Sequence, residues 1–165
     1  MHTLIQRLRS ATLLTALLLP VVAIAGKPAS SDAVKAAITQ QLNRYEQALN
    51  ASDIDGVMKL YAEHAVFMPQ HSLPAVGRDA VRAAYRGVFD TIRLDVDFTV
   101  DEIQPLSRDW AYARTRSNGT VKVLGSAAPA SAEANQELFI FHRETDGRWL
   151  FARYIFSTTQ PLKQP

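Results

Sequence analysis

Residues 43–89, NRYEQALNASDIDGVMKLYAEHAVFMPQHSLPAVGRDAVRAAYRGVF, decide the fold of this chain. Their pattern predicts the end of one helix, a short second helix, an apolar strand, a loop and a third helix that starts at Gly77. Tyr45, Tyr61 and Tyr85 fall one on each predicted helix, each on an otherwise apolar face. We therefore expect three phenol groups to point toward one interior.

The boundaries of these elements follow from capping residues and from proline. Apolar residues at steps of three and four predict a first helix that is capped by Ser31 or Asp32. Asp53 is expected to cap the second helix, which His64 would end as a cap at the carboxyl terminus. The apolar run Ala65–Met68 precedes a proline and predicts one short buried strand.

After residue 91 the hydrophobic period changes from 3.6 to 2, which predicts a run of antiparallel strands. Gly119 is expected to form a bulge or bend, and Asp146-Gly147 is a strong hairpin signal. Helices followed by long strands indicate an α+β fold, with about three helices on one face of a strongly curved, mostly antiparallel sheet. A curled sheet that helices close leaves a cavity, the usual place for a ligand. The predicted strands span residues 94–101, 110–123, 137–143 and 148–157.

The first 25 residues have the features of a signal peptide: an early basic region, an apolar stretch and small residues before Ala25. We expect cleavage after Ala25, a linker over residues 26–30, one domain over residues 31–160 and a tail over residues 161–165. The protein would then be periplasmic or secreted and would not be held in a membrane after cleavage.

The expected mature chain carries equal numbers of acidic and basic residues, because both arginines of the leader are removed. It has no cluster of Lys and Arg, so nothing in its charge favours a nucleic-acid partner. No histidine spacing is typical of a metal site, and no glycine-rich phosphate loop occurs. We therefore expect no metal and no cofactor.

The order of elements resembles the NTF2-like superfamily, with its cystatin-like α+β cone, and most closely its secreted SnoaL-like, SgcJ/EcaC-type group. The stretches that carry the resemblance are RYEQALNASDIDGVMKLYAEHAVFMPQ, VGRDAVRAAY and ELFIFHRETDGRWLFARYIF. Together they cover most of the expected mature chain. The resemblance implies a homodimer that forms through the outer face of the sheet.

The superfamily includes the ketosteroid isomerases, and the resemblance implies which of their groups this chain keeps. Tyr45 falls where that family has a tyrosine that donates to the oxyanion, and the supporting tyrosines match Tyr61 and Tyr85. The aspartate base is replaced at Met68-Pro69-Gln70, and the second acid falls near Phe139. Proline and phenylalanine cannot transfer a proton, so the sequence excludes an isomerase of that mechanism.

Two polar candidates remain open to alternative interpretations. His71 lies within two residues of the missing aspartate and could act as a substitute base, or it is an exposed loop histidine. Arg114 and Arg116 share a strand face with Trp110 and Tyr112, and either line the pocket or face solvent or a dimer partner. Asp95, Asp97 and Asp101 are expected on a solvated face, and His142 is expected to point outward.

Three functions fit these observations. The first is an exported pocket protein for a small, largely apolar molecule, aromatic or polyketide-like. The second is a cofactor-independent isomerase, cyclase or dehydratase with His71 as base and Tyr45 as oxyanion donor. The third is a non-catalytic protein-interaction module. The residues predicted to bind the ligand are Tyr45, Tyr61, Phe67, Met68, Tyr85, Arg114, Phe139, Tyr154 and Phe156.

Overall fold

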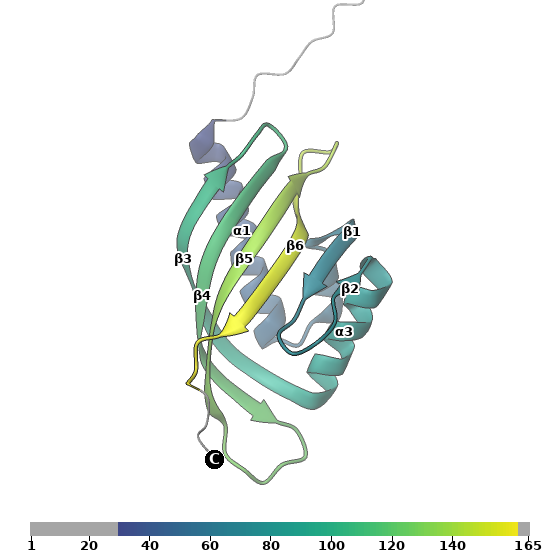
Figure 1. Ribbon diagram of the computed structural model, residues 1–165, viewed down its shortest axis with the longest axis vertical. Coiled ribbons are helices and arrows are strands. Elements are labelled where there is room, and N and C mark those ends of the chain that lie inside the picture. Colours follow the sequence, from purple (N-terminus) through teal and green to yellow (C-terminus); the bar gives the residue numbers. More distant parts are fainter. Residues whose placement is uncertain (1–29, 162–165) are drawn as a thin grey trace, which may run out of the picture.

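The computed structural model describes residues 30–161, which form three helices and one six-stranded sheet (Figure 1). The three helices and two shorter strands come first, and four long strands follow, as the hydrophobic periods predict. The elements are α1 (Ser31–Asn50), α2 (Ile54–Met58), β1 (Tyr61–Met68), β2 (Ala75–Val76), α3 (Arg78–Thr91), β3 (Ile92–Pro105), β4 (Trp110–Val123), β5 (Ser131–Arg143) and β6 (Trp149–Thr158).

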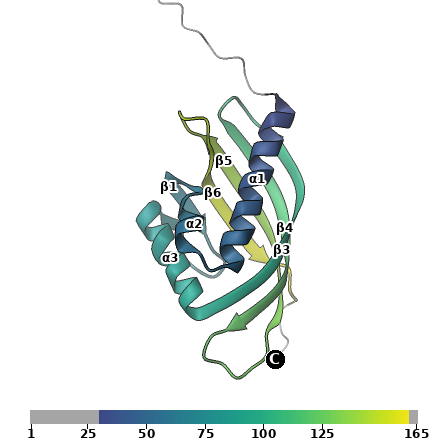
Figure 2. The same cartoon turned by 180° about the vertical axis from the view of Figure 1, so that it is seen from behind.

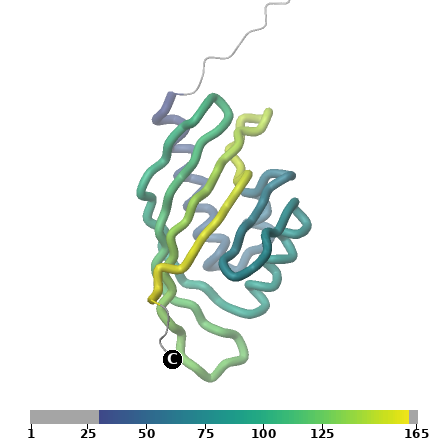
Figure 3. Tube along the Cα trace, in the orientation of Figure 1, coloured from purple at the N-terminus to yellow at the C-terminus, as the bar shows by residue number. Residues whose placement is uncertain are grey.

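The strand order of the sheet is β2-β1-β6-β5-β4-β3. Neighbouring strands are antiparallel except β1 and β6, which are parallel. The last four strands follow one another as a meander, which appears as adjacent, curving traces in Figure 3. The expectation of an α+β cone with a mostly antiparallel sheet is therefore confirmed.

All three helices lie on the concave side of the sheet, where α1 runs along the strands (Figure 2). The stripe of apolar residues on α1 is buried, including Ile38 and Leu42 at 0% and 1% exposed. Polar side chains near the carboxyl-terminal end of α1 hold the helix to β3. Asn50 Nδ2 donates to Val96 O and its Oδ1 accepts from Val96 N, while Glu46 Oε2 accepts from Phe98 N.

The sheet curls because extra residues interrupt two of its strands. In β3 the register shifts at Asp101, and in β6 it shifts at Ala152. The predicted bulge at Gly119 is wrong, because Gly119 pairs regularly with Val96 and with Glu133. Glycine is required there for a different reason: a Cβ atom would lie 2.0 Å from the carbonyl oxygen of Asp95.

Several predicted boundaries are shifted. The cap of α1 is Ser30, whose hydroxyl accepts from Ala33 N, so the helix begins one residue earlier than expected. Asp53 caps α2 as predicted, but α2 ends at Met58. Tyr61 and His64 therefore lie in β1, and the prediction that His64 ends a helix is wrong. The strand begins earlier because the chain turns at Lys59 and Leu60, and Phe151 N then donates to Leu60 O at 2.7 Å.

The predicted leader, its cleavage point and nearly all of the predicted linker and tail lie outside the described residues. Within residues 30–161 no helix combines the length and apolar composition needed to cross a membrane.

Candidate functional site

A partly open cavity of about 140 Å³ lies between the concave face of the sheet, α1 and α3. It sits where the carboxyl-terminal ends of α1 and α3 meet the beginning of β3. Its wall is mostly apolar and contains six aromatic rings. The lining residues are Tyr45, Leu49, Phe67, Tyr85, Val88, Ile92, Leu94, Val96, Phe98, Ser117, Glu133, Asn135, Glu137, Tyr154 and Phe156.

The three tyrosines of the opening stretch converge on one point. The Tyr85 hydroxyl lies 2.6 Å from the Tyr45 hydroxyl and 2.7 Å from the Tyr61 hydroxyl. Tyr85 is therefore the centre of a three-hydroxyl chain. Tyr45 and Tyr85 line the cavity, whereas Tyr61 supports them from behind.

Burial determines the protonation of these phenols. Loss of solvation raises the pKa of Tyr45, Tyr61 and Tyr85 well above the ordinary tyrosine value, and does the same for Tyr154. All four therefore stay protonated at any physiological pH. They can donate hydrogen bonds to a ligand but cannot act as bases.

The aromatic side chains form a rigid wall around the hydroxyls. Phe67 stacks on Tyr85 with ring centroids 5.0 Å apart, and on Tyr154 at 5.3 Å. Tyr154 in turn stacks on Phe139 at 4.2 Å. Parallel, offset rings of this kind pack tightly and hold one another in place.

A buried carboxyl group, Glu137, also lines the cavity, and the sequence analysis did not single it out. Its exposed fraction is 4%. The Thr115 hydroxyl donates to Glu137 Oε2. Burial raises the pKa of Glu137, and hydrogen bonding to Thr115 and Ser117 offsets part of that rise. Alternation could have found this residue, because Glu137 precedes Phe139 and Phe141 on the inward-facing side of one strand.

Polar groups on β4 and β5 continue from Glu137 along the cavity wall. Asn135 Nδ2 donates to Glu133 Oε1 at 2.9 Å and lies 3.4 Å from Ser117 Oγ. The Glu133 carboxylate can only accept, so it fixes which end of the Asn135 amide carries the NH₂ group. Asn135 Oδ1 is buried and accepts no hydrogen bond from any described residue.

The cavity brings together five of the nine residues predicted to bind a ligand. These are Tyr45, Phe67, Tyr85, Tyr154 and Phe156. Phe139 and Tyr61 are fully buried behind the wall. Met68 does not line the cavity, because it follows Phe67 on the strand and its side chain therefore points to the opposite face.

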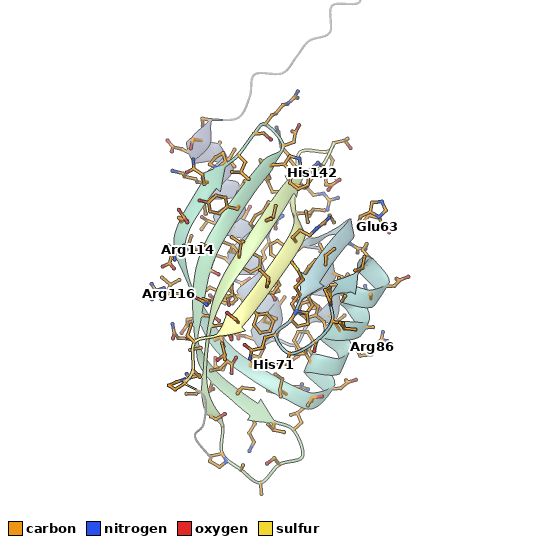
Figure 4. The ribbon with its side chains drawn as sticks, in the orientation of Figure 1. Glu63, His71, Arg86, Arg114, Arg116 and His142 are labelled. Atoms are coloured by element: carbon orange, nitrogen blue, oxygen red, sulfur yellow. The ribbon has the colours of Figure 1, made fainter. Side chains whose placement is uncertain are left out.

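Arg114 lies on the outer face of the sheet, so the interpretation that it lines the pocket is wrong (Figure 4). Its guanidinium contacts Asp101 at 2.8 Å and Glu102 at 3.2 Å. Arg116 pairs with the same Asp101 and holds the pKa of that carboxyl below its usual value. The register puts even-numbered residues of β4 outside, so both arginines lie on the face that the alternative interpretation assigned to solvent or a dimer partner.

The two remaining histidine candidates, His71 and His142, are both absent from the residues that line the cavity. His71 is exposed in the loop after β1, with a φ of 59°, and is not among the lining residues. His142 packs against Trp110 on the outer face, with ring centroids 4.7 Å apart and the rings tilted by 54°, which agrees with the outward orientation expected for it. The carboxyl groups that line the cavity belong to Glu133 and Glu137, and His71 is not near them in the lining.

Residues 30–161 contain no group of three or more His, Asp or Glu side chains placed to hold a metal ion. The chemistry the described cavity offers consists of phenol donors, carboxyl and amide acceptors and aromatic faces.

A curled sheet closed by three helices around one small cavity defines the NTF2-like class of cone-shaped domains. The chain belongs to the SnoaL-like domain family, whose profile matches residues 42–152. Membership of the SgcJ/EcaC-type group within it stays a prediction. No curated protein is significantly similar to the chain.

Solved structures agree with this assignment. A ketosteroid isomerase-like protein from Erwinia carotovora atroseptica SCRI1043 is 32% identical, with a TM-score of 0.73 over 76% of this chain and 96% of that chain. A protein from Novosphingobium aromaticivorans DSM 12444, provisionally named a scytalone dehydratase, is 20% identical, with a TM-score of 0.67 over 77% and 85%. A cystatin-like domain from Nostoc punctiforme PCC 73102 is 18% identical, with a TM-score of 0.65 over 81% and 82%. The last two similarities establish the fold alone.

Proposed function

We propose that this protein binds a small, largely apolar molecule with one ring in the cavity between the sheet, α1 and α3. The single observation that carries the proposal is the cavity itself, which joins aromatic walls to a few convergent polar groups.

The volume of the cavity limits the size of the ligand. An apolar cavity of roughly 150 Å³ is known to accept benzene, and drug-sized ligands occupy roughly 300–1,000 Å³. At about 140 Å³ this cavity suits one ring with a short substituent. A polycyclic, polyketide-like ligand would need the walls to move, so we propose the single-ring class.

The arrangement of the wall orients the ligand. Phe67, Phe156 and Phe98 would pack its body, while the hydroxyls of Tyr45 and Tyr154 and the carboxyl of Glu137 would contact its polar atom. Because the tyrosine hydroxyls already bond one another, the site is preorganised and loses little conformational freedom when a ligand binds.

Binding is tested by NMR titration of the purified protein with benzyl alcohol and with a two-ring analogue, 1-naphthylmethanol. Eight heavy atoms at about 0.5 kcal/mol each give a Kd on the order of 1 mM for benzyl alcohol. The expected shifts are confined to methyl groups of Leu49, Val88 and Val96. Absence of any shift at 20 mM benzyl alcohol, or tighter binding of the naphthyl compound, refutes the proposal.

A matched pair of variants shows where the ligand sits. Leu94 lines the cavity, so Leu94→Trp should fill it and abolish the shifts. Leu138 lies on the outer face and is 38% exposed, so Leu138→Trp makes the same change without touching the cavity. Equal effects of the two variants would place binding elsewhere.

A second candidate function is cofactor-independent proton transfer, and one observation favours it: a buried carboxyl with a raised pKa shares the cavity with the phenol of Tyr45. In this version Glu137 replaces His71 as the acid or base, and Tyr45 donates to the developing oxyanion. The test is exchange of α-hydrogens of a small cyclic ketone into D₂O. Glu137→Gln should abolish the exchange and His71→Ala should leave it unchanged; the reverse pattern refutes this version.

We further propose export by cleavage after Ala25 and a homodimer formed through the outer sheet face. Support for the dimer comes from Trp110, Leu138 and Ile155, which are 38–43% exposed on that face. Intact mass of the protein recovered from its own compartment tests the cleavage. Light scattering tests the dimer, which Leu138→Arg should convert to a monomer.

A further inference from the structure

The buried carboxyl of Glu137 has no positive partner among the described residues. Its recorded bonds come from hydroxyl groups on β4, and no ion pair within residues 30–161 includes it. Buried carboxylates in proteins are normally paired with a cation, because removing the charge from water is costly. An unpaired one beside a cavity points to a partner that is not part of the chain.

The cavity lining as a whole is also negatively charged. It carries two carboxylates, Glu133 and Glu137, and no Lys, Arg or His among its described residues. Asn135 adds a buried Oδ1 that accepts no hydrogen bond within the described chain. The side chains on β5 that face the cavity are therefore rich in acceptors and negative charge.

Aromatic faces surround these acceptors. Six of the fifteen lining residues are aromatic. The face of an aromatic ring carries partial negative charge and attracts cations, and cages of such rings recognise organic ammonium groups. Ring faces and carboxylates together favour a ligand that is apolar over most of its surface and positively charged at one end.

We propose that the ligand of this cavity is a small cyclic or aromatic amine, bound as its ammonium form with the nitrogen at Glu137. This inference rests on the proposed function, because it names the chemical class of the molecule that the cavity holds. The ammonium group donates to the Glu137 carboxylate and to Asn135, and the ring packs between Phe67, Phe98 and Phe156. A primary ammonium has three N–H donors, which matches the acceptors available.

The groups that face Glu137 from each element agree with a cationic ligand. From β4 come the hydroxyls of Thr115 and Ser117, and from β5 comes the Glu133 carboxylate. From β6 and α3 come the protonated phenols of Tyr154 and Tyr85, which lie close enough to sense the charge of Glu137. None of these groups carries a positive charge that would repel an ammonium ion.

The inference is tested by comparing benzylamine with benzyl alcohol, two probes of nearly equal size that differ in charge. Isothermal titration or NMR of the wild-type protein at pH 8 should give benzylamine an affinity at least tenfold higher. Glu137→Gln should remove this preference, so that the two probes bind the variant with affinities within about threefold of each other, since glutamine keeps the shape and an acceptor oxygen for Thr115 but carries no charge. Glu102→Gln, the same change on the outer face, should leave the preference intact.

The outcomes separate the two proposals. If benzyl alcohol binds as well as benzylamine or better, or if Glu137→Gln keeps the preference, the amine inference is overturned while the cavity remains a binding site. If neither probe binds, the proposed function itself fails. The wild-type comparison needs no variant, so it remains decisive even if Glu137→Gln does not fold.

Discussion

Replacing Tyr85 with phenylalanine removes the central hydroxyl of the three-tyrosine chain. Tyr45 is 2% exposed and Tyr61 is 0% exposed, so both residues are shielded from bulk water in the folded protein. Each would lose the bond to Tyr85, at 2.6 and 2.7 Å respectively. A buried polar group left without its partner costs about 1–3 kcal/mol. We therefore expect Tyr85→Phe to lower the free energy of unfolding by about 2–4 kcal/mol.

Tyr61, at the end of the three-hydroxyl chain, should contribute less to stability than Tyr85 at its centre. Tyr61→Phe removes one bond and leaves the Tyr85 hydroxyl still bonded to Tyr45, so its expected cost is about 1 kcal/mol. Tyr112, half-buried on the outer face, makes no recorded side-chain hydrogen bond within residues 30–161. Tyr112→Phe is thus the matched control, with an expected change within about 0.5 kcal/mol.

Urea unfolding followed by fluorescence measures all three variants. The midpoint should fall in the order Tyr112→Phe, Tyr61→Phe, Tyr85→Phe, with an unchanged m-value, because the same surface is exposed on unfolding. A Tyr85→Phe protein as stable as Tyr61→Phe would show that the hydroxyl chain contributes nothing at its centre. That result would also remove the argument that the cavity is preorganised.

Three further predictions concern other parts of the molecule. Burial raises the pKa of Glu137 in the folded protein, so the contribution of this group to stability is complete below the unfolded pKa near 4.3 and is lost as pH rises through the folded pKa. Between these two pKa values, the stability of Glu137→Gln relative to wild type should rise with pH by at most about 1.4 kcal/mol per pH unit. Parallel curves of stability against pH for the two proteins would contradict this. Gly119→Ala places a Cβ 2.0 Å from Asp95 O and should lower the free energy of unfolding, measured by thermal melting, by about 1–3 kcal/mol or more. Gly87→Ala lies on the open surface of α3 and should raise it by about 0.5–1 kcal/mol. The opposite order would show that β3 and β4 separate easily. Arg114→Ala removes exposed ion pairs, so it should change the free energy of unfolding by less than about 1 kcal/mol and leave the Kd for benzyl alcohol unaltered. Weaker binding of benzyl alcohol would show that Arg114 contributes to the binding site.

The sequence by itself determined the elements and the inward faces of most of them. The stripe on α1, the cap at Asp53, the limits of β4 and the Asp146-Gly147 turn are local signals, each readable within a few residues. The change of hydrophobic period after residue 91 likewise determined that the sheet follows the helices. The alternation of β5 also predicts the inward position of Glu137, because this residue shares its strand face with Phe139 and Phe141.

The tertiary structure alone decided which of these side chains meet. Tyr61 was expected on a helix, yet it reaches the Tyr85 hydroxyl from the start of β1, because the turn after α2 and the pairing of β1 with β6 set its position. Arg114 could be assigned to the outer face once the register with Leu138 was known. The charge balance of the cavity also depends on this register, since a shift of one residue would exchange Glu137 for Leu138. Periodicity acts within a strand, whereas a cavity is made by the pairing and curvature of several strands.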